Sequence, residues 1–360
     1  MKKSIKIESY RGSYCVRLSG DKSKEGLYKT LEEISSESFL VVDSKIDKLY
    51  PEIKTAWDSN RIFLVDAKEE NKSLESCNSL ISFLIERKIK KNNKIVAVGG
   101  GIVQDLVSFS ASIIYRGIDW IFVPTTLLSQ ADSCIGSKTS INFNGVKNLL
   151  GTFHPPREIH SFSLFLETLS DDDIKSGIGE ILHYYLIYNS KNLKSLNESY
   201  EKIFSNRSIL LPHVFESLNI KKKMIEVDEF DKNERNIFNY GHTFGHAIEV
   251  ISNYEISHGR AVTLGMDIAN FISYKKSLIT IDRYKELRNL IKKNIPEFDI
   301  EPGTIKDYIS ILQKDKKNTK NTIRCILLND SKAEIYNITS NKKLEEYLIE
   351  YFENMECENV

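Results

Sequence analysis

The sequence has no excess of charge of either sign. Lysine and arginine together number 50, as do aspartate and glutamate, so the 360-residue chain has a formal net charge of zero. A chain without an overall positive field has nothing to hold a nucleic acid or an anionic membrane at long range. We therefore expect neither partner, although a local basic pocket stays compatible with this composition.

Cysteine is scarce and lacks the spacing of a metal-binding motif. The five cysteines, at positions 15, 77, 134, 325 and 357, are odd in number and include no C-x-x-C pair. This pattern argues against a disulfide framework and against a cysteine-ligated zinc ion. We expect a reducing, cytoplasmic location.

Long apolar runs are also missing. No stretch approaches the roughly eighteen apolar residues of a membrane span, and the basic start, MKKSIKIES, has no apolar run behind it. The sequence therefore predicts a soluble protein without a targeting segment.

The first part of the chain has the alternating strand-like and helix-like segments expected of a parallel sheet. Short apolar runs at residues 39–42, 61–65, 94–98 and 120–123 alternate with longer helix-like segments such as 74–90. Alternation of this kind is typical of an α/β, Rossmann-like domain, which we place at residues 1–168.

The pattern of apolar and polar residues changes after about residue 165. Amphipathic stretches at residues 174–188, 210–226, 241–251 and 260–275 indicate helices. The chain is longer than one typical domain. We therefore predict a second, mainly α-helical domain at residues 169–360.

Three consecutive glycines, Gly99 to Gly101, follow a predicted strand and precede the helix-like residues 105–114. Backbone amides at such a helix N-terminus can hold a pyrophosphate, because no side chain keeps the phosphates away. The pattern is not G-x-G-x-x-G, so by itself it fits a dinucleotide or a plain tight turn equally well. Asp43, after the run at residues 39–42, is a candidate partner for an adenosine ribose and equally an ordinary turn-opening aspartate.

A histidine-rich motif, NYGHTFGHAIE, is followed closely by SHG, and the two contain three of the seven histidines. His242 and His246 are four residues apart, so a helix would place both on one face. Gly241 and Gly245 leave that face open to close approach. The H-x-x-x-H spacing is compatible with both histidines binding a metal ion, but the glutamate of H-E-x-x-H proteins is absent. We interpret the motif as half of a metal-dependent active site.

Further short motifs occur in one order along nearly the whole chain. They are GGGIVQD at 99–105, YRG at 115–117, VPTTLL at 123–128, ADS at 131–133, GSKT at 136–139, KN at 147–148, GE at 179–180, Lys221, DE at 228–229, Arg235, the histidine motif at 239–249 and 257–259, and DKK at 315–317. Together they resemble the 3-dehydroquinate synthases of the sugar-phosphate cyclase superfamily. The resemblance implies that family's fold, an NAD cofactor, a divalent metal (Zn²⁺ or Co²⁺) and a place in the shikimate pathway of aromatic amino acid biosynthesis.

The same resemblance assigns residues to the two cofactors. Glu180, His242 and His258 would form a two-histidine, one-carboxylate site suited to Zn²⁺ as a Lewis acid, and His246 is left to the substrate. The NAD site would consist of Asp43, Lys72, Gly99, Gly100, Gly101, Asp105, Thr125, Thr126 and Thr168.

The implied substrate is a phosphorylated seven-carbon keto acid, whose phosphate and carboxylate need charge-assisted hydrogen bonds. By resemblance, the substrate residues are Asp132, Lys138, Asn148, Lys221, Arg235, Asn239, His246, and Lys316 and Lys317 of the DKK motif. Arg235 would grip the carboxylate. Arg116 in such enzymes reaches into the neighbouring subunit's site, which implies a homodimer.

The chain departs from the family's pattern at several positions. His183 stands three residues after the zinc glutamate, where a lysine of the substrate pocket is usual, so a permanent cation becomes a titratable one. Gln104, Ser137, Asp231 and Arg260 also replace the usual residues, and Asp231 only shortens a carboxylate arm.

The leading interpretation is cyclisation of 3-deoxy-D-arabino-heptulosonate 7-phosphate to 3-dehydroquinate, with loss of phosphate and with NAD regenerated in each turnover. The alternative that His183 supports is a cyclase of another sugar phosphate, of the 2-deoxy-scyllo-inosose or 2-epi-5-epi-valiolone synthase type. A substrate without a carboxylate would leave Arg235 unpaired, which is costly. Two further alternatives are a polyol dehydrogenase and a catalytically silent binding protein. Net accumulation of NADH with a simple polyol would identify the first, and failure to retain zinc or NAD would identify the second.

Overall fold

The computed structural model of the chain describes residues 2–188, 190–298, 300, 302–314, 318, 321–330, 332–340 and 342–358. The chain divides into two compact units. The N-terminal unit is Met1–Ser170 together with Asn206–Arg235, and the helical unit is Asp171–Ser205 together with Asn236–Val360. Residues 206–235 thus belong to the N-terminal unit, although they follow the predicted domain boundary at residue 168 and share the helical texture of that half.

The N-terminal unit is built on a mainly parallel sheet. In the described residues the sheet has seven strands in the order β1-β2-β9-β6-β5-β3-β4, and only the β1–β2 pair is antiparallel. The strands are β1 (Lys2–Ile7), β2 (Tyr14–Ser19), β3 (Ser38–Asp43), β4 (Ile62–Val65), β5 (Lys94–Gly99), β6 (Trp120–Pro124) and β9 (Glu158–Phe162). The four predicted apolar runs form β3, β4, β5 and β6, which confirms the α/β class.

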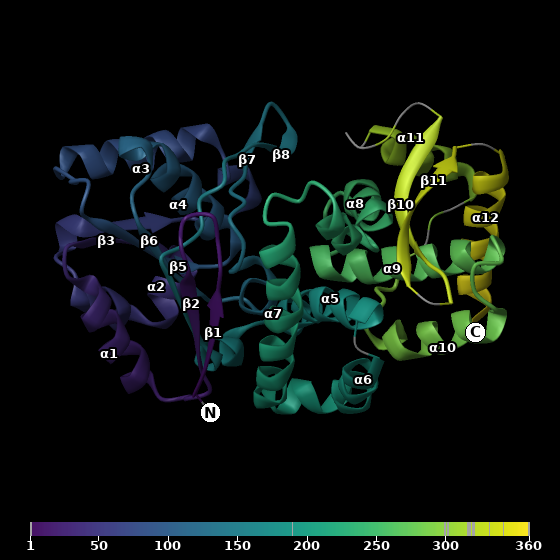
Figure 1. Cartoon of the computed structure of the whole chain (residues 1–360), viewed down its shortest axis with the longest axis horizontal. Coiled ribbons are helices and arrows are strands. Elements are labelled where there is room, and N and C mark those ends of the chain that lie inside the picture. The colour runs from purple at the N-terminus through teal and green to yellow at the C-terminus, as the bar shows by residue number, and fades with distance from the viewer. Residues whose placement is uncertain are drawn as a thin grey trace. The chain divides into compact units, whose positions relative to one another are not determined.

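Helices cover both faces of this sheet, as expected for parallel strands joined by crossovers. Figure 1 shows α1 (Lys24–Ser35) and α2 (Ser44–Leu49) on one face, with α3 (Leu74–Glu86) and α4 (Gly101–Ile113) on the other. Leu40 and Val42 of β3 belong to the same buried cluster as residues of α1 and α2, because alternate side chains of a strand point to one face. A short hairpin, β7 (Ile141–Phe143) with β8 (Val146–Leu150), and α7 (Leu210–Val227) complete the unit.

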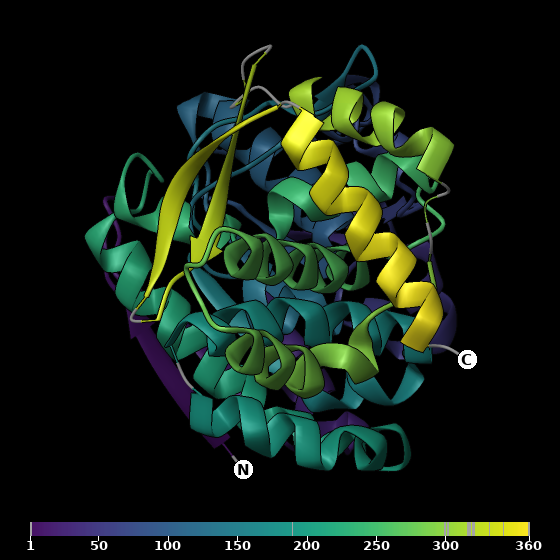
Figure 2. The ribbon, with the colours of Figure 1, turned by 90° about the vertical axis from the view of Figure 1, so that its right-hand side faces the viewer.

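The helical unit is centred on α9 (His258–Lys275), which is buried along most of its length and contacts α5, α8, α10, α12 and β10. Figure 2 gives a second view of these helices, with α12 in yellow. Its elements are α5 (Asp171–Tyr188), α6 (Ser190–Ser205), α8 (His242–Ile251), α9, α10 (Ile281–Ile291), α11 (Ile305–Lys314), β10 (Thr322–Leu328), β11 (Ala333–Thr339) and α12 (Lys342–Glu358). Among the described residues, no helix combines the length and the apolar character needed to cross a membrane.

Candidate active site

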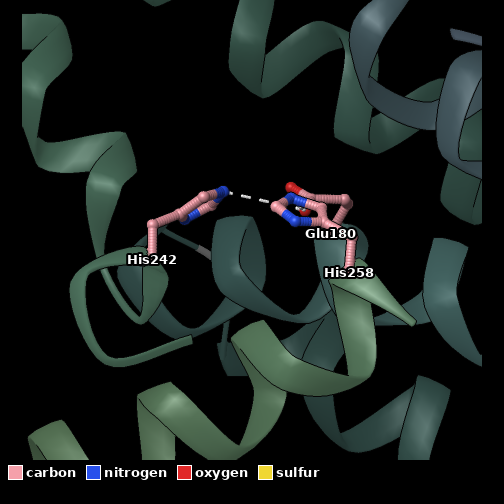
Figure 3. Close-up of side chains that lie close together, drawn as sticks. All are labelled: Glu180, His242 and His258. Atoms are coloured by element: carbon pink, nitrogen blue, oxygen red, sulfur yellow. Dashed lines mark ion pairs between the residues drawn. The ribbon is translucent and has the colours of Figure 1, made fainter. Parts of the chain in front are cut away.

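Glu180, His242 and His258 lie together within the helical unit. Each offers one ligand atom, and these atoms lie within 4.8 Å of one another. Glu180 Oε1 is 3.1 Å from His258 Nε2 and 3.7 Å from His242 Nε2, and Figure 3 shows the three side chains turned toward a common point. His242 and His258 are the first residues of α8 and α9, while Glu180 lies within α5. These residues are up to 78 positions apart in the sequence, and three helices bring them together.

In both imidazoles Nδ1 has a polar partner, which leaves Nε2 available to bind a cation. His242 Nδ1 lies 3.3 Å from the carbonyl oxygen of Tyr240, and His258 Nδ1 lies 3.0 Å from Glu249 Oε2. Such partners fix the tautomer with hydrogen on Nδ1 and raise the basicity of Nε2, as is usual for metal-binding histidines. Two imidazole lone pairs and one carboxylate oxygen then face each other, a donor set that fits Zn²⁺ or Co²⁺.

The pKa values of all three side chains are shifted from their usual values. Burial lowers the pKa of His242 to about 4, so its ring is neutral at pH 7. Burial alone would raise the pKa of Glu180, but the adjacent histidines hold that pKa well below its usual range. Burial also opposes protonation of His258, yet the carboxylates of Glu180 and Glu249 raise the pKa of this ring well above its usual value. A metal ion binding at Nε2 would displace that proton.

Glycines let the backbones of α5 and α9 touch where two of these side chains begin. A Cβ atom on Gly179 would lie 1.9 Å from the carbonyl oxygen of Gly259, and one on Gly259 would lie 1.7 Å from that of Ser176. No side chain fits at either position. The contact places Glu180, the residue after Gly179, beside His258, the residue before Gly259.

Glycines serve α8 and α9 in the same way. A Cβ atom on Gly245 would lie 2.8 Å from the Cα of Val262, and one on Gly265 would lie 2.1 Å from the carbonyl oxygen of Gly241. The open face predicted from Gly241 and Gly245 is therefore occupied by α9 and not by a ligand. The ligand position lies at the first turn of each helix.

Glu249 and His246 extend the cluster. His246 is exposed, and its ring centroid lies 5.5 Å from that of His242 and 5.7 Å from that of His258. His246, Glu249 and His258 form a second group whose atoms could hold a cation. Glu249 was not among the site residues predicted from the sequence. A glutamate at the end of the histidine motif could have signalled one, because metal-binding histidines commonly donate to a carboxylate.

The glycine loop of the N-terminal unit has the form of a phosphate cradle. Gly99 ends β5, Gly100 caps α4 and Gly101 begins it. A Cβ atom on Gly101 would meet nothing within 4 Å, whereas one on Gly100 would lie 2.9 Å from a side-chain carbon of Thr126. Gly101 thus borders open space at the N-terminus of α4, which leaves room for the pyrophosphate of a dinucleotide.

The other predicted NAD residues are held by local contacts. Asp43 caps α2 by accepting from the amide of Lys45 at 2.8 Å, and burial raises the pKa of its carboxyl. The cap gives Asp43 a structural task whether or not it binds a ribose. Thr125 is buried, Thr126 Oγ1 lies 2.8 Å from Ser129 Oγ, and Thr168 Oγ1 lies 3.3 Å from the hydroxyl of Tyr50.

The buried Lys72 forms an ion pair with the partly buried Asp105, with Lys72 Nζ 2.6 Å from Asp105 Oδ2. Ser140 donates to the same carboxylate through its amide and its hydroxyl, each at 3.0 Å. The hydroxyl of Ser140 also lies 3.0 Å from Asn148 Oδ1. Ser140 therefore links Asn148 to the Asp105–Lys72 pair, although the family resemblance assigned Asn148 to the substrate and the other two residues to NAD.

Three predicted anion-binding cations gather in the N-terminal unit. Lys221 Nζ lies 2.9 Å from Asp132 Oδ1 and donates to the Asp132 carbonyl at 2.8 Å. Lys138 forms an ion pair with Asp231. Burial lowers the pKa of Lys138, and the positive charges of Arg235 and Lys221 lower it further. The carboxylate of Asp231 raises this pKa but does not outweigh them. Positive charges that oppose the protonation of Lys138 favour an anion bound beside it.

Arg235 is buried and fixed by its own segment. Its Nη1 donates to the carbonyl of Glu229 at 2.7 Å, and its amide donates to Asp228 Oδ2 at 3.1 Å. Gly136, at a φ of +108°, allows the guanidinium to approach, since a Cβ atom there would lie 3.3 Å from Nη2. Its remaining donors suit a planar carboxylate.

The remaining predicted residues have separate surroundings. Arg116 is exposed on a turn in which Tyr115 (φ 50°), Arg116 (φ 60°) and Gly117 (φ 116°) are all left-handed, a conformation that is strained for the first two. Asn239 donates to the carbonyl of Asn236 at 2.8 Å. Lys316 and Lys317 lie outside the described residues.

The substituted positions are accommodated in distinct ways. Gln104 is buried and exchanges two hydrogen bonds with Ser133, through the carbonyl at 2.6 Å and the hydroxyl at 2.7 Å. It thereby ties α4 to the segment that carries Asp132. Ser137 is buried, and Arg260 pairs at 3.1 Å with the exposed Asp172.

Solved structures with the same fold include sugar-phosphate cyclases. A 2-deoxy-scyllo-inosose synthase superposes with a TM-score of 0.83 at 23% identity, covering 97% of this chain and 99% of that one. A 2-epi-5-epi-valiolone synthase from Streptomyces hygroscopicus gives 0.80 at 21% identity, covering 94% and 96%. An iron-containing alcohol dehydrogenase from Corynebacterium glutamicum gives 0.62 at 13% identity, covering 93% of each chain. The fold is that of the dehydroquinate synthase-like sugar-phosphate cyclases.

Sequence similarity narrows this class. Residues 62–176 match the 3-dehydroquinate synthase N-terminal family, and residues 177–318 match the 3-dehydroquinate synthase C-terminal family. The 3-dehydroquinate synthase of Clostridium tetani is 36% identical over 334 residues, covering 90% of this chain and 88% of the relative. That of Pelagibacter ubique is 34% identical over 354 residues, covering 94% and 95%. The chain belongs to the 3-dehydroquinate synthase family.

Proposed function

We propose that the protein is a 3-dehydroquinate synthase, a lyase that converts 3-deoxy-D-arabino-heptulosonate 7-phosphate to 3-dehydroquinate and phosphate. The observation that carries the substrate assignment is Arg235, a buried guanidinium near Lys138. Among the described residues the Arg235 guanidinium forms no ion pair, and a buried cation left unpaired is costly, so this residue favours a substrate with a carboxylate as well as a phosphate.

Two cofactors complete the proposal. Glu180, His242 and His258 hold Zn²⁺ or Co²⁺, which supplies a Lewis acid that polarises substrate oxygens. The loop Gly99–Gly101 holds NAD, which takes up and returns a hydride and is not consumed. In support, the 2-epi-5-epi-valiolone synthase was solved with NAD⁺ and Zn²⁺, and a 2-deoxy-scyllo-inosose synthase with carbaglucose-6-phosphate, NAD⁺ and Co²⁺.

The chain's own residues bind, orient and move protons. Lys138 and Lys221 bind the anionic groups of the substrate, and Asp132, held by Lys221, accepts from its hydroxyls. His246 is exposed beside the metal ligands and is placed to assist the proton transfer of the phosphate elimination. The substrate phosphate itself also takes part in this proton transfer. If His246→Ala left turnover unchanged, this last assignment would be wrong.

The alternative is a cyclase of another sugar phosphate, whose support in the sequence was His183. A substrate without a carboxylate leaves Arg235 unpaired, so the structure gives this alternative less support.

The protein acts as a homodimer. In the proposed homodimer, the exposed Arg116 reaches the partner subunit's site from its left-handed turn. The enzyme acts in the cytoplasm, in the shikimate pathway of aromatic amino acid biosynthesis.

Phosphate release from the purified, zinc- and NAD-loaded protein tests the substrate. We expect release from 3-deoxy-D-arabino-heptulosonate 7-phosphate and none above background from sedoheptulose 7-phosphate or glucose 6-phosphate. Release from one of the latter two alone would establish the alternative cyclase.

A further inference from the structure

His183 does not occupy the position of a solvent-facing cation. Its side chain is 2% exposed and is enclosed by aromatic rings, with ring centroids 4.0 Å from Tyr184, 5.7 Å from Phe238 and 5.4 Å from His242. An imidazole packed in this way has little freedom to follow a substrate anion. The expectation that His183 substitutes for a pocket lysine is therefore not what its surroundings favour.

The polar contact of this ring is with the candidate metal ligand. His183 follows Glu180 by one turn of α5, so the two side chains share a face. His183 Nδ1 lies 3.3 Å from Glu180 Oε2. A nitrogen that faces a carboxylate oxygen carries its hydrogen, because two lone pairs would repel.

The two oxygens of Glu180 therefore face different groups. Oε2 faces His183, whereas Oε1 is the oxygen nearest to His258 and His242, at 3.1 and 3.7 Å. Within the described residues, neither ring nitrogen of His183 forms a hydrogen bond to another group, so nothing competes with the 3.3 Å ion-pair contact between Nδ1 and Oε2. The carboxylate thus has one oxygen held from behind and one presented to the histidines.

We infer that His183 is a positioning residue that holds Glu180 by Oε2, so that the carboxylate binds the metal ion through Oε1 alone. The inference rests on the proposed function only in taking the Glu180, His242 and His258 group to hold a metal ion. Partners of this kind behind a metal ligand typically change metal affinity about 10–100-fold. His183 accordingly tunes the metal centre and does not supply charge to the substrate.

Metal titration of the full-length protein without substrate tests the inference. His183→Leu removes the donor and keeps an apolar side chain in the aromatic enclosure. His183→Asn places an amide N–H where Nδ1 lies. We expect His183→Leu to weaken Zn²⁺ binding about 10–100-fold in competition with a chelator, and His183→Asn to recover most of that loss.

The visible spectrum of the Co²⁺-substituted protein separates positioning from packing. We expect His183→Leu to change the ligand-field bands and His183→Asn to restore them, while thermal unfolding shows that both variants are folded. Equal metal affinity and equal spectra in wild type and His183→Leu would overturn the inference, as would an Asn variant no better than the Leu variant at similar stability.

The same variants distinguish a substrate role. If His183→Leu kept its metal affinity but raised the KM for the sugar phosphate, His183 would contact substrate and the inference would fail. Because the titration contains no substrate, a wild-type protein that binds metal but cyclises no heptulosonate phosphate would contradict the proposed function and leave the result for His183 in place.

Discussion

Glu249 Oε2 lies 3.0 Å from Nδ1 of His258, on the side of the ring away from Glu180. The two carboxylates thus hold one imidazole from both nitrogens. Glu249→Ala removes the outer contact and should weaken Zn²⁺ binding about 10–100-fold. Glu249→Gln keeps an acceptor and should lose less.

Competition with a fluorescent chelator measures this effect. Glu255→Ala, at an exposed position in the connection between α8 and α9, is the matched control and should bind metal like the wild type. An Ala variant at position 249 that retained wild-type affinity would show that His258 is oriented by other means.

Gly179 is predicted to be intolerant of any side chain. Gly179→Ala places a methyl group 1.9 Å from the Gly259 carbonyl, so α5 and α9 must separate. We expect a loss of about 3 kcal/mol or more in the free energy of unfolding. Gly303→Ala, where a Cβ atom meets nothing within 4 Å, should show no comparable loss. Urea unfolding of both variants decides, and a stable Gly179→Ala would contradict the close helix contact.

His213 of α7 should make stability depend on pH. Burial lowers the pKa of this ring from 6.5 to about 4, so between these values the unfolded chain binds more protons than the folded one. Its contribution to stability is complete above pH 6.5 and is lost as the pH falls toward 4, by up to roughly 3 kcal/mol.

Urea unfolding at pH 7.5 and pH 5 measures the slope. We expect His213→Gln to lose less stability than the wild type over this interval, since glutamine does not titrate. Identical slopes for the two proteins would mean that His213 titrates normally in the folded state.

Lys221 and its neighbour offer a contrast between a pocket charge and a surface charge. Lys221 is buried against Asp132, whereas Lys222 is partly exposed and lies 3.7 Å from Glu226. Lys221→Met should lower kcat/KM for the heptulosonate phosphate roughly 10- to 100-fold, as expected for about 1.5–3 kcal/mol of charge-assisted binding. Lys222→Met should leave it unchanged. Equal effects of the two substitutions would remove Lys221 from the proposed pocket.

Much of the fold follows from local pattern. The apolar runs that become β3, β4, β5 and β6 and the glycines before α4 are signals carried by neighbouring residues. The return of residues 206–235 to the N-terminal unit was not predictable, because a helix has the same periodicity whichever unit it packs against.

The site shows the same division between local and distant information. The metal ligands were found through a family motif, yet the roles of Gly241 and Gly245 depend on α9, which approaches them from later in the chain. His183 was expected in a substrate pocket, and its enclosure by Phe238 and His242 became apparent only in three dimensions. Contacts between distant segments leave no periodic signal in a sequence.

The most direct test follows phosphate, dehydroquinate and NADH together while the zinc- and NAD-loaded protein acts on 3-deoxy-D-arabino-heptulosonate 7-phosphate. The proposed function predicts one phosphate released per dehydroquinate formed, many turnovers per bound NAD, and no accumulation of NADH. Absence of dehydroquinate, or NADH accumulating in step with product, would contradict it.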